Sequence, residues 1–415
     1  MSVIELLRRN RDFKMLWLAS VVSLGGDWFA TVAIIGKVTD LGKGTWLTPA
    51  LAASFVFVCQ MLPSFLITPI AGPLADRFDR KRIMIVASLL QSGAALLFLV
   101  SDRNTLWLAF AAQAAVSTLA GFFSPASQAS LANLVTPADL PKAASLLGTT
   151  WGAMLALGSS LGAWFSTQFG RDAAFIADAV SFLIAVFFIT RIKGATRAPS
   201  ATVRARMRPI VDTREALSYA RTNRPLFFLL FSKGGFGLSS GVVGVLTSLA
   251  DHRFGGGDRT IGLLLAARGV GVVLGPVVAG RLGAKKDVAG ILRTCGWSCV
   301  VYGIAYFAVG HAGFLWLVIV LTAVAHLGGG TQWTLSTYGL NANTPDEYRG
   351  RIGSADFALV SLSMSISFLV GGWLDRAFGA TTAFTVLAIV SLLWGALYLR
   401  ATTSIRADAA DAARA

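Results

Sequence analysis

The sequence predicts an all-α membrane protein with twelve transmembrane helices arranged as two six-helix pseudo-repeats. Only 14% of its 415 residues are charged and 55% are hydrophobic, whereas soluble domains carry about 25% charged residues. The mean hydropathy is +0.66. Apolar runs long enough to cross a hydrocarbon core of about 30 Å recur along the chain, and one polar stretch divides them into two sets of six.

Each apolar run is predicted to be a helix, because unpaired backbone groups are not tolerated in lipid. The first set covers approximately 14–38, 47–71, 83–101, 105–130, 142–168 and 173–191. The second set covers approximately 225–250, 259–282, 288–310, 313–339, 352–376 and 379–400. These runs define an N-terminal bundle (1–190), a cytoplasmic linker (191–224), a C-terminal bundle (225–400) and a cytoplasmic tail (401–415).

The distribution of Lys and Arg predicts the orientation. Segments on the same side as the N-terminus carry 27 of these residues, and the opposite loops carry seven. Since positive residues favour the cytoplasmic side, we expect both termini in the cytoplasm. Because these cations lie between apolar runs rather than on one soluble face, we expect no nucleic-acid partner.

The linker is Arg-rich and contains Pro199 and Pro209. Four of its apolar residues fall roughly on one side of a helical wheel, namely Ile210, Val211, Leu217 and Ala220. This spacing predicts a short amphipathic helix at the inner membrane surface. The alternative is a solvated linker that charge alone holds near anionic lipid.

The two halves resemble each other at an offset of about 208 residues. The matching positions are Asn10-Arg11 with Asn223-Arg224, Pro69 with Pro276, Thr136-Pro137 with Thr344-Pro345, Gly162-Ala163-Trp164 with Gly371-Gly372-Trp373, and Gly170 with Gly379. Their common offset indicates a duplicated six-helix unit. Two parallel repeats of this kind are a transporter architecture, with the substrate path at the repeat interface.

The segment Gly72-Pro73-Leu74-Ala75-Asp76-Arg77-Phe78-Asp79-Arg80-Lys81-Arg82 resembles the loop signature of the major facilitator superfamily, with Asp79 in place of the usual second Gly. Small residues permit a tight turn, Asp76 can face the positive end of a helix, and the cations can bridge to acids. We expect the gating residues to be Gly72, Asp76, Arg77, Arg80, Lys81 and Asp356, with Arg80 reaching Asp356. The alternative is that the cations only enforce orientation.

The segment Thr344-Pro345-Asp346-Glu347-Tyr348-Arg349-Gly350-Arg351 is similar to the signature of a bacterial exporter subfamily that includes the enterobactin exporter and macrolide efflux proteins. Two departures disfavour the larger drug–proton antiporter subfamilies. The run 105–130 has no Arg or Lys, and Gly162 is followed by Ala163 rather than Pro. These departures leave the siderophore and macrolide exporter group.

The resemblance implies a secondary active transporter that exports a small organic molecule, drug-like or siderophore-like, by proton antiport with alternating access. We expect a monomer in the bacterial inner membrane, with substrate, protons and membrane lipids as partners. The chain has no phosphate-binding Gly-x-x-x-x-Gly-Lys-Ser/Thr loop and no His/Cys cluster. We therefore expect no enzyme, no cofactor and no metal. The alternatives are a lysophospholipid transporter, based on Gly26-Asp27, and a non-transporting membrane sensor.

Ionisable residues within the apolar runs are candidate functional residues, because their burial without a partner is costly. Asp27 lies about 20 Å along the first helix, which the resemblance places at the cavity. We expect proton coupling to involve Asp27, Arg268 and His326, with Arg268 pairing with Asp27 or binding an anionic substrate group. The alternatives are a structural Asp27 pair and a neutral, hydrogen-bonded His326. Asp178 is predicted to be a peripheral packing residue.

Substrate contacts are expected from aromatic and polar residues on helices that the resemblance places at the cavity. Aromatic rings there can stack on a bulky ring-bearing substrate, although interface anchoring and packing are the alternatives. The candidate residues are Trp28, Phe29, Gln113, Trp151, Lys233 and Trp333. For Lys233, the alternative is that its side chain extends to the membrane surface.

Overall fold

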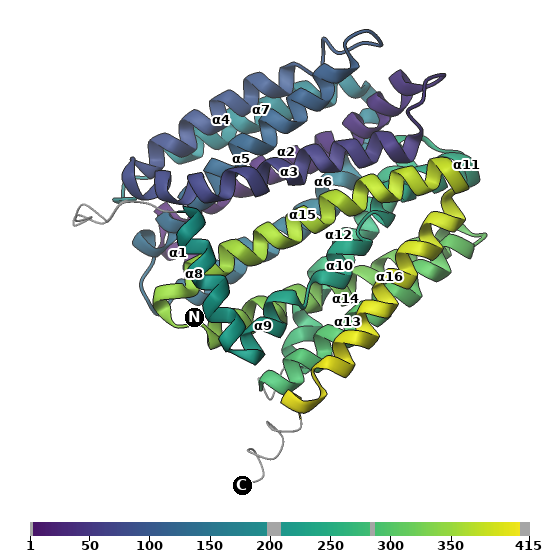
Figure 1. Ribbon diagram of the computed structural model, residues 1–415. Coiled ribbons are helices and arrows are strands. Elements are labelled where there is room, and N and C mark those ends of the chain that lie inside the picture. Colours follow the sequence, from purple (N-terminus) through teal and green to yellow (C-terminus); the bar gives the residue numbers. More distant parts are fainter. Residues whose placement is uncertain (1–2, 197–208, 283–286, 407–415) are drawn as a thin grey trace. The chain divides into compact units, whose positions relative to one another are not determined.

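The computed structural model describes residues 3–196, 209–282 and 287–406, and every regular element in these ranges is a helix (Figure 1). The helices are α1 (Val3–Arg9), α2 (Arg11–Gly42), α3 (Pro49–Arg77), α4 (Arg80–Leu96), α5 (Leu106–Leu134), α6 (Leu140–Phe169), α7 (Arg171–Thr190), α8 (Pro209–Thr222), α9 (Arg224–Phe231), α10 (Gly234–Ser239), α11 (Val242–Phe254), α12 (Gly257–Leu282), α13 (Val288–His311), α14 (Leu315–Asn343), α15 (Asp346–Phe378) and α16 (Ala380–Ala401). The all-α prediction is confirmed.

Ten segments of the described chain are long and apolar enough to cross a membrane. One of them, Arg224–Phe254, comprises the three consecutive helices α9, α10 and α11. Together with α4 and α6, these segments correspond to the twelve predicted runs. The helices α1 and α8 are additional and short.

The chain divides into two compact units. The first unit comprises Met1–Lys43 and Leu66–Met207, and the second comprises Gly44–Phe65 and Arg208–Ala415. In the first unit α2 packs on α6 and α7, and α4 packs on α5 and α7. In the second unit α12 packs on α14, and α13 packs on α14 and α16. The helix α3 therefore contributes its first half to the second unit and its second half to the first.

The first half of α3 is held within the second unit by close contacts with α11 and α15. The Thr247 hydroxyl donates a hydrogen bond to the Pro49 carbonyl at 3.0 Å. The rings of Phe57 and Phe368 stack with centroids 5.1 Å apart. A Cβ at Gly244 or Gly372 would lie less than 3 Å from the Ser54 hydroxyl, so small residues permit this approach.

Helix starts repeat between the halves, as the sequence offset predicts. Asn10 caps α2 by accepting the Phe13 N–H at 2.9 Å, and Asn223 caps α9 by accepting the Leu226 N–H at 3.2 Å. A side-chain acceptor at this position satisfies one of the N–H groups left open at a helix start. The equivalence of Asn10 and Asn223 in geometry supports the duplication.

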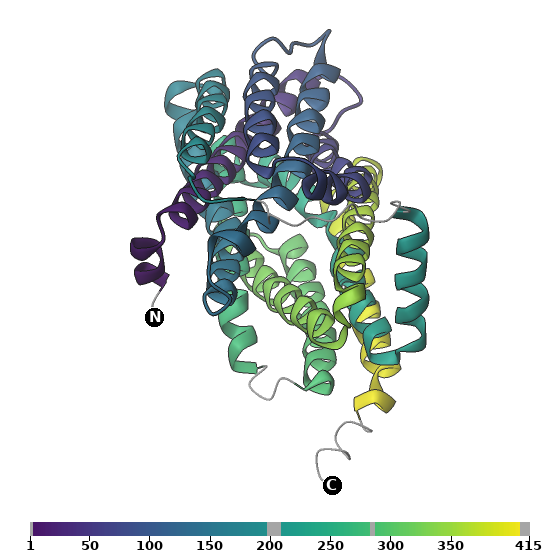
Figure 2. The same cartoon turned by 90° about the vertical axis from the view of Figure 1, so that its left-hand side faces the viewer.

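The helix α8 lies alongside the start of α15 (Figures 1 and 2). The Tyr219 and Tyr348 rings stack with centroids 4.7 Å apart, and Glu215 pairs with Arg351 at 3.5 Å. Ala220 is fully buried in the core of the second unit. Pro199 and the side chains of Ile210 and Val211 lie outside the described residues.

Candidate functional site

Two carboxyl groups come together inside the first unit. Asp27 lies at the midpoint of α2, and Asp178 on α7 is 2% exposed. A Cβ built on Gly26 would lie 2.6 Å from Asp178 Oδ1, so this carboxyl lies against the α2 backbone immediately before Asp27. The Ser181 hydroxyl lies 3.5 Å from the same oxygen, and the two carboxyls interact electrostatically.

The arrangement of the two acids suits proton binding. Like charges that are close together in a medium of low dielectric repel each other, and a proton on one carboxyl removes that repulsion. Asp178 was expected at the periphery of the bundle, and the structure corrects this placement because its side chain points inward against α2. The sequence carries no signal for this contact, since Gly26 and Asp178 are about 150 residues apart.

The aromatic candidates of the first unit contact one another. Trp28 and Trp151 meet edge to face at 5.5 Å, and the rings of Phe29 and Phe165 lie 5.1 Å apart. Because Trp28 is 2% exposed, its ring packs α2 against α6. Gln113, which is 5% exposed, donates to the Ser117 hydroxyl at 3.1 Å.

A buried ion pair lies at a helix break in the second unit. Lys233 sits between the end of α9 and the start of α10, and its Nζ pairs with Asp356 Oδ2 on α15. The ammonium also donates to the Thr337 hydroxyl at 3.3 Å and lies 4.7 Å from the centroid of the Trp333 ring. Lys233 is 3% exposed, so its side chain does not extend to the surface.

Gln332 supports the helix break and was not singled out from the sequence. Its Nε2 donates to the Ser232 carbonyl at 2.5 Å, and Ser232 is the residue before Lys233. A carbonyl released from a helix needs such a donor when it is buried. The position of Gln332 directly before Trp333 in an apolar run is the signal that could have found it.

A second cluster in the second unit surrounds His326. The Tyr306 hydroxyl and His326 Nε2 form a hydrogen bond of 2.9 Å. Arg268, which is 5% exposed, interacts electrostatically with Tyr302 and Tyr306. His326 is 1% exposed, and its hydrogen bond matches the alternative of a buried, hydrogen-bonded histidine. The expected pairing of Arg268 with Asp27 stays a prediction.

Two basic residues at the start of α4 bind backbone carbonyls of several segments of the first unit. The Arg80 guanidinium donates to the carbonyls of Ala75, Ala129 and Thr196 at 2.8–3.1 Å. Lys81 Nζ donates to the carbonyls of Thr190 and Ile192, where α7 ends. Cations at a helix C-terminus satisfy its open carbonyl groups.

Of the remaining gating candidates, the structure describes the surroundings of Asp356 and not those of the others. The surroundings of Gly72 and the side chains of Asp76 and Arg77 lie outside the described part of the structure. Asp356 is paired with Lys233 within the second unit, while Arg80 donates to carbonyls of the first. The expected gating contact between Arg80 and Asp356 stays a prediction.

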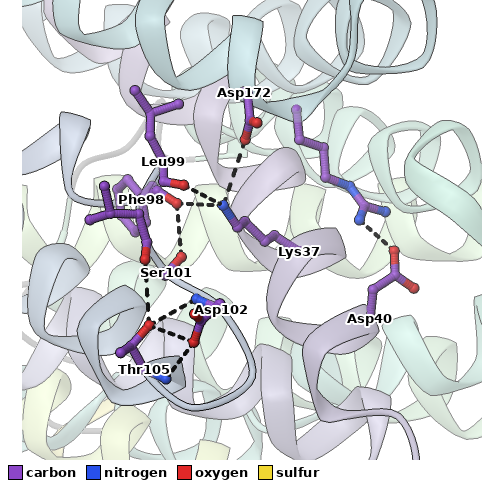
Figure 3. Close-up of polar contacts among 10 residues, drawn as sticks. Lys37, Asp40, Phe98, Leu99, Ser101, Asp102, Thr105 and Asp172 are labelled. Carbon is purple, nitrogen blue, oxygen red and sulfur yellow. Dashed lines mark hydrogen bonds and ion pairs between the residues drawn. The ribbon is translucent and has the colours of Figure 1, made fainter.

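A polar network closes the end of the first unit at which α2 terminates (Figure 3). Lys37 Nζ donates to the Phe98 carbonyl at 2.6 Å and lies 3.6 Å from Asp172. Asp40 pairs with Arg171 at 2.5 Å. In the adjoining loop, Asp102 accepts the N–H groups of Thr105 and Asn104, and these bonds lower the pKa of the Asp102 carboxyl below its ordinary value.

Comparison with known proteins gives a family match over nearly the whole chain. Residues 6–414 match the family model described as transmembrane secretion effector. The chain is 26% identical over 322 residues to the uncharacterized MFS-type transporter YkuC of Bacillus subtilis (strain 168), covering 74% of this chain and 73% of the relative. It is 24% identical to the putative bacilysin exporter BacE of Bacillus amyloliquefaciens, covering 93% of each chain.

The fold is similar to those of solved transporters. The crystal structure of the human organic anion transporter MFSD10 (TETRAN) matches with a TM-score of 0.64 and 18% identity, covering 94% of this chain and 99% of that one. A POT family transporter in complex with 5-aminolevulinic acid matches with a TM-score of 0.72 and 13% identity, covering 96% and 97%. At these identities the likeness describes the fold.

Proposed function

Because this chain belongs to the transmembrane secretion effector family of major facilitator transporters, which are not enzymes, we propose that it exports a small organic molecule across the bacterial cytoplasmic membrane in exchange for protons. The similarity to a putative bacilysin exporter supports the direction of transport and the size of the substrate. The chain is a multi-pass membrane protein, as the ten candidate spans among its described residues also indicate.

The acidic pair of Asp27 and Asp178 carries the proposal of proton exchange. A transporter driven by protons needs a group whose charge changes in each cycle. Asp27 lies at the midpoint of a membrane-length helix, α2. The carboxyl of the buried Asp178, on α7, lies against Gly26, the residue before Asp27. When one of the two carboxyls is protonated, the pair carries a single negative charge. Release of that proton restores the repulsion between the two carboxylates.

The narrower resemblance to siderophore and macrolide exporters stays part of the proposal. Its signature begins α15, where Arg349 donates to the carbonyls of Asn341 and Thr344. Tyr348 of the same signature stacks on Tyr219 of the linker helix α8. These contacts give the signature a structural role at the joint of α14, α15 and α8, so the signature supports relationship and does not identify the substrate.

The test is gradient-driven flux in proteoliposomes. Ethidium, erythromycin and a catecholate siderophore serve as probes, and a pyranine-filled lumen reports proton movement. The wild type should move at least one probe with coupled proton movement. Asp27→Asn should abolish acceleration by an imposed pH gradient while leaving exchange of labelled for unlabelled probe intact.

The matched control is Asp375→Asn, which replaces a buried aspartate on α15 in the other unit. This variant should retain its response to the gradient. An Asp27→Asn protein that still responds fully to the pH gradient would show that coupling resides elsewhere. A wild type that moves none of the probes would contradict export of these classes of molecule.

A further inference from the structure

The contacts of Lys233 form a complete binding arrangement for a primary ammonium. They consist of a carboxylate from Asp356, a hydroxyl acceptor from Thr337 at 3.3 Å, and the face of the Trp333 indole at 4.7 Å from its centroid. Carboxylates and hydroxyls accept hydrogen bonds from an ammonium, and an indole face attracts the cation. The side chain of the protein's own lysine occupies this arrangement.

Asp356 has acceptor capacity that Lys233 does not use. Lys233 contacts Oδ2, while Oδ1 is buried and accepts no hydrogen bond from any residue within 3–196, 209–282 or 287–406. Leaving a buried acceptor without a partner costs about 1–3 kcal/mol, and more when the acceptor is charged. An additional N–H donor at Oδ1 would remove this cost.

Trp333 is more exposed than the two charged residues of the arrangement. Lys233 and Asp356 are 3% and 7% exposed, whereas Trp333 is 37% exposed. Part of the indole is therefore available to an apolar group while the ammonium of Lys233 lies over its ring. The ammonium of Lys233 is held by Asp356 Oδ2 and the Thr337 hydroxyl, which leaves Oδ1 for a second donor.

We propose that a protonated amine of the exported molecule binds Asp356 Oδ1 beside Lys233, with its apolar body against the exposed part of Trp333. The inference rests on the proposed export function and names its substrate class, an organic cation that joins an amine to an apolar ring. Asp356 then bridges two ammonium groups, one on each carboxylate oxygen.

The experiment uses three probes with one fluorophore and different tails. Dansylcadaverine carries a protonated amine, its N-acetyl derivative is neutral, and dansyl-6-aminohexanoate carries a carboxylate. Fluorescence titration of the purified full-length protein in detergent should show about tenfold to a hundredfold tighter binding of dansylcadaverine than of the other two, as expected for a hydrogen bond between charged groups. Equal binding of the three probes, or binding of none, would overturn the proposal.

Variants assign the selectivity to this site. Asp356→Asn should remove the preference for the amine, whereas Asp375→Asn should keep it. Asp375 is the matched control because it lies on the same helix, is also 7% exposed and also has a buried Oδ1 that accepts no hydrogen bond within the described ranges. Retained amine selectivity in a folded Asp356→Asn protein would contradict the proposal.

A second pair of variants leaves the ion pair intact. Trp333→Leu should weaken dansylcadaverine binding, by up to about tenfold for loss of the cation–π and ring contacts, and Trp333→Phe should restore part of it. Unchanged binding in Trp333→Leu would overturn the assignment of the ring.

Flux of the probes in proteoliposomes is measured separately. Amine-selective binding without flux would contradict the proposed export function but support the amine site at Asp356. Equal flux of all three probes would support export but contradict the amine site.

Discussion

At Gly26 the absence of a side chain decides whether two acids can lie together. A Cβ there would lie 2.6 Å from Asp178 Oδ1 and 2.1 Å from the Ser181 hydroxyl. Neither oxygen can retreat freely, since Asp178 and Ser181 are buried on α7. Asp178 can therefore lie beside Asp27 only because residue 26 is a glycine, which has no Cβ.

Gly26→Ala should disturb the acidic pair, and Gly25→Ala should not. The new methyl group at residue 26 overlaps two oxygens, so we expect a loss of about 1–3 kcal/mol in the free energy of unfolding. At residue 25 the nearest atom is Met154 Sδ at 3.4 Å, an ordinary contact. Thermal unfolding of both variants in detergent measures the difference, and equal midpoints would contradict the predicted overlap.

The two acids also show what single residues reveal before a structure is known. Asp27 could be singled out because a carboxyl deep in an apolar run is costly without a functional or structural reason. Asp178 lies in an equally apolar run, yet its partner depends on which face of α7 meets α2, and one sequence does not contain that information. For Lys233, the sequence indicated a cation within an apolar run, either at the cavity or extended to the membrane surface, but not its pairing with Asp356, 123 residues away.

At the scale of elements, the halves share the chemistry of their helix ends. Asp79 caps α4 by accepting the Arg82 N–H at 3.0 Å, and Asp287 caps α13 by accepting the Gly290 N–H at 2.8 Å. Gly170 and Gly379 have φ of 85° and 84°, a left-handed conformation that favours glycine. These ends were predictable, because caps and turns depend on residues adjacent in sequence.

Asp79→Ala and Asp287→Ala should each destabilise the protein by about 1 kcal/mol, as for other lost helix caps. Asp139→Ala is the control, since Asp139 stands at the start of α6 without a capping hydrogen bond from its side chain. Denaturation of the three variants in mixed micelles measures the effect. A loss in Asp139→Ala as large as in the other two would show that the capping bonds are not its cause.

The crossing of α6 over α2 depends on glycines in α6. A Cβ at Gly162 would lie 2.2 Å from the Phe29 carbonyl oxygen, whereas one at Gly148 would meet nothing within 4 Å. Gly162→Ala should therefore force the helices apart and lower stability by several kcal/mol or prevent folding, because the obstacle is backbone. Gly148→Ala should be neutral or stabilising by up to about 1 kcal/mol through helix propensity. Expression level and monodispersity in detergent compare the two, and a well-folded Gly162→Ala protein would contradict the close crossing.

The broken helix between Arg224 and Phe254 was not predictable from hydropathy. The run 225–250 is continuous in apolar character, and the sequence predicted one helix. The interruption at Ser232 is stabilised by Gln332, whose amide comes from a residue 100 positions away. Hydrophobic periodicity describes which residues are buried, and it does not describe where a distant side chain replaces a backbone hydrogen bond.

At the scale of the whole molecule, the bias of 27 to seven Lys and Arg predicts how the chain lies in the membrane. Arg103 and Arg259 belong to the poorly charged side, while Arg9 and Arg221 belong to the richly charged side. All four side chains are exposed. Loops of both sides are therefore accessible to a reagent in water.

Cysteine at residue 103 or 259 should react with a membrane-impermeant maleimide on intact cells, and cysteine at residue 9 or 221 should react only after lysis. The background carries Cys59→Ser, since Cys59 is half-buried, while Cys295 and Cys299 are fully buried. The positive-inside rule is the physical reason for the expected pattern. The reverse labelling pattern would invert the orientation and place both termini outside.

The division of α3 between the two units has a consequence for how the chain is made. Thr247 and Pro49, which share a hydrogen bond in the second unit, are separated by 198 residues. During synthesis the ribosome delivers 49–65 to the membrane long before α11 and α15 exist to receive it. Early in insertion this segment has only lipid or the translocon to cover Ser54 and its neighbours. Completion of the second unit therefore waits for the last third of the chain and still requires a piece of its first sixth. The first half of the gene encodes all of the first unit, whereas the second half alone lacks a segment of the second unit.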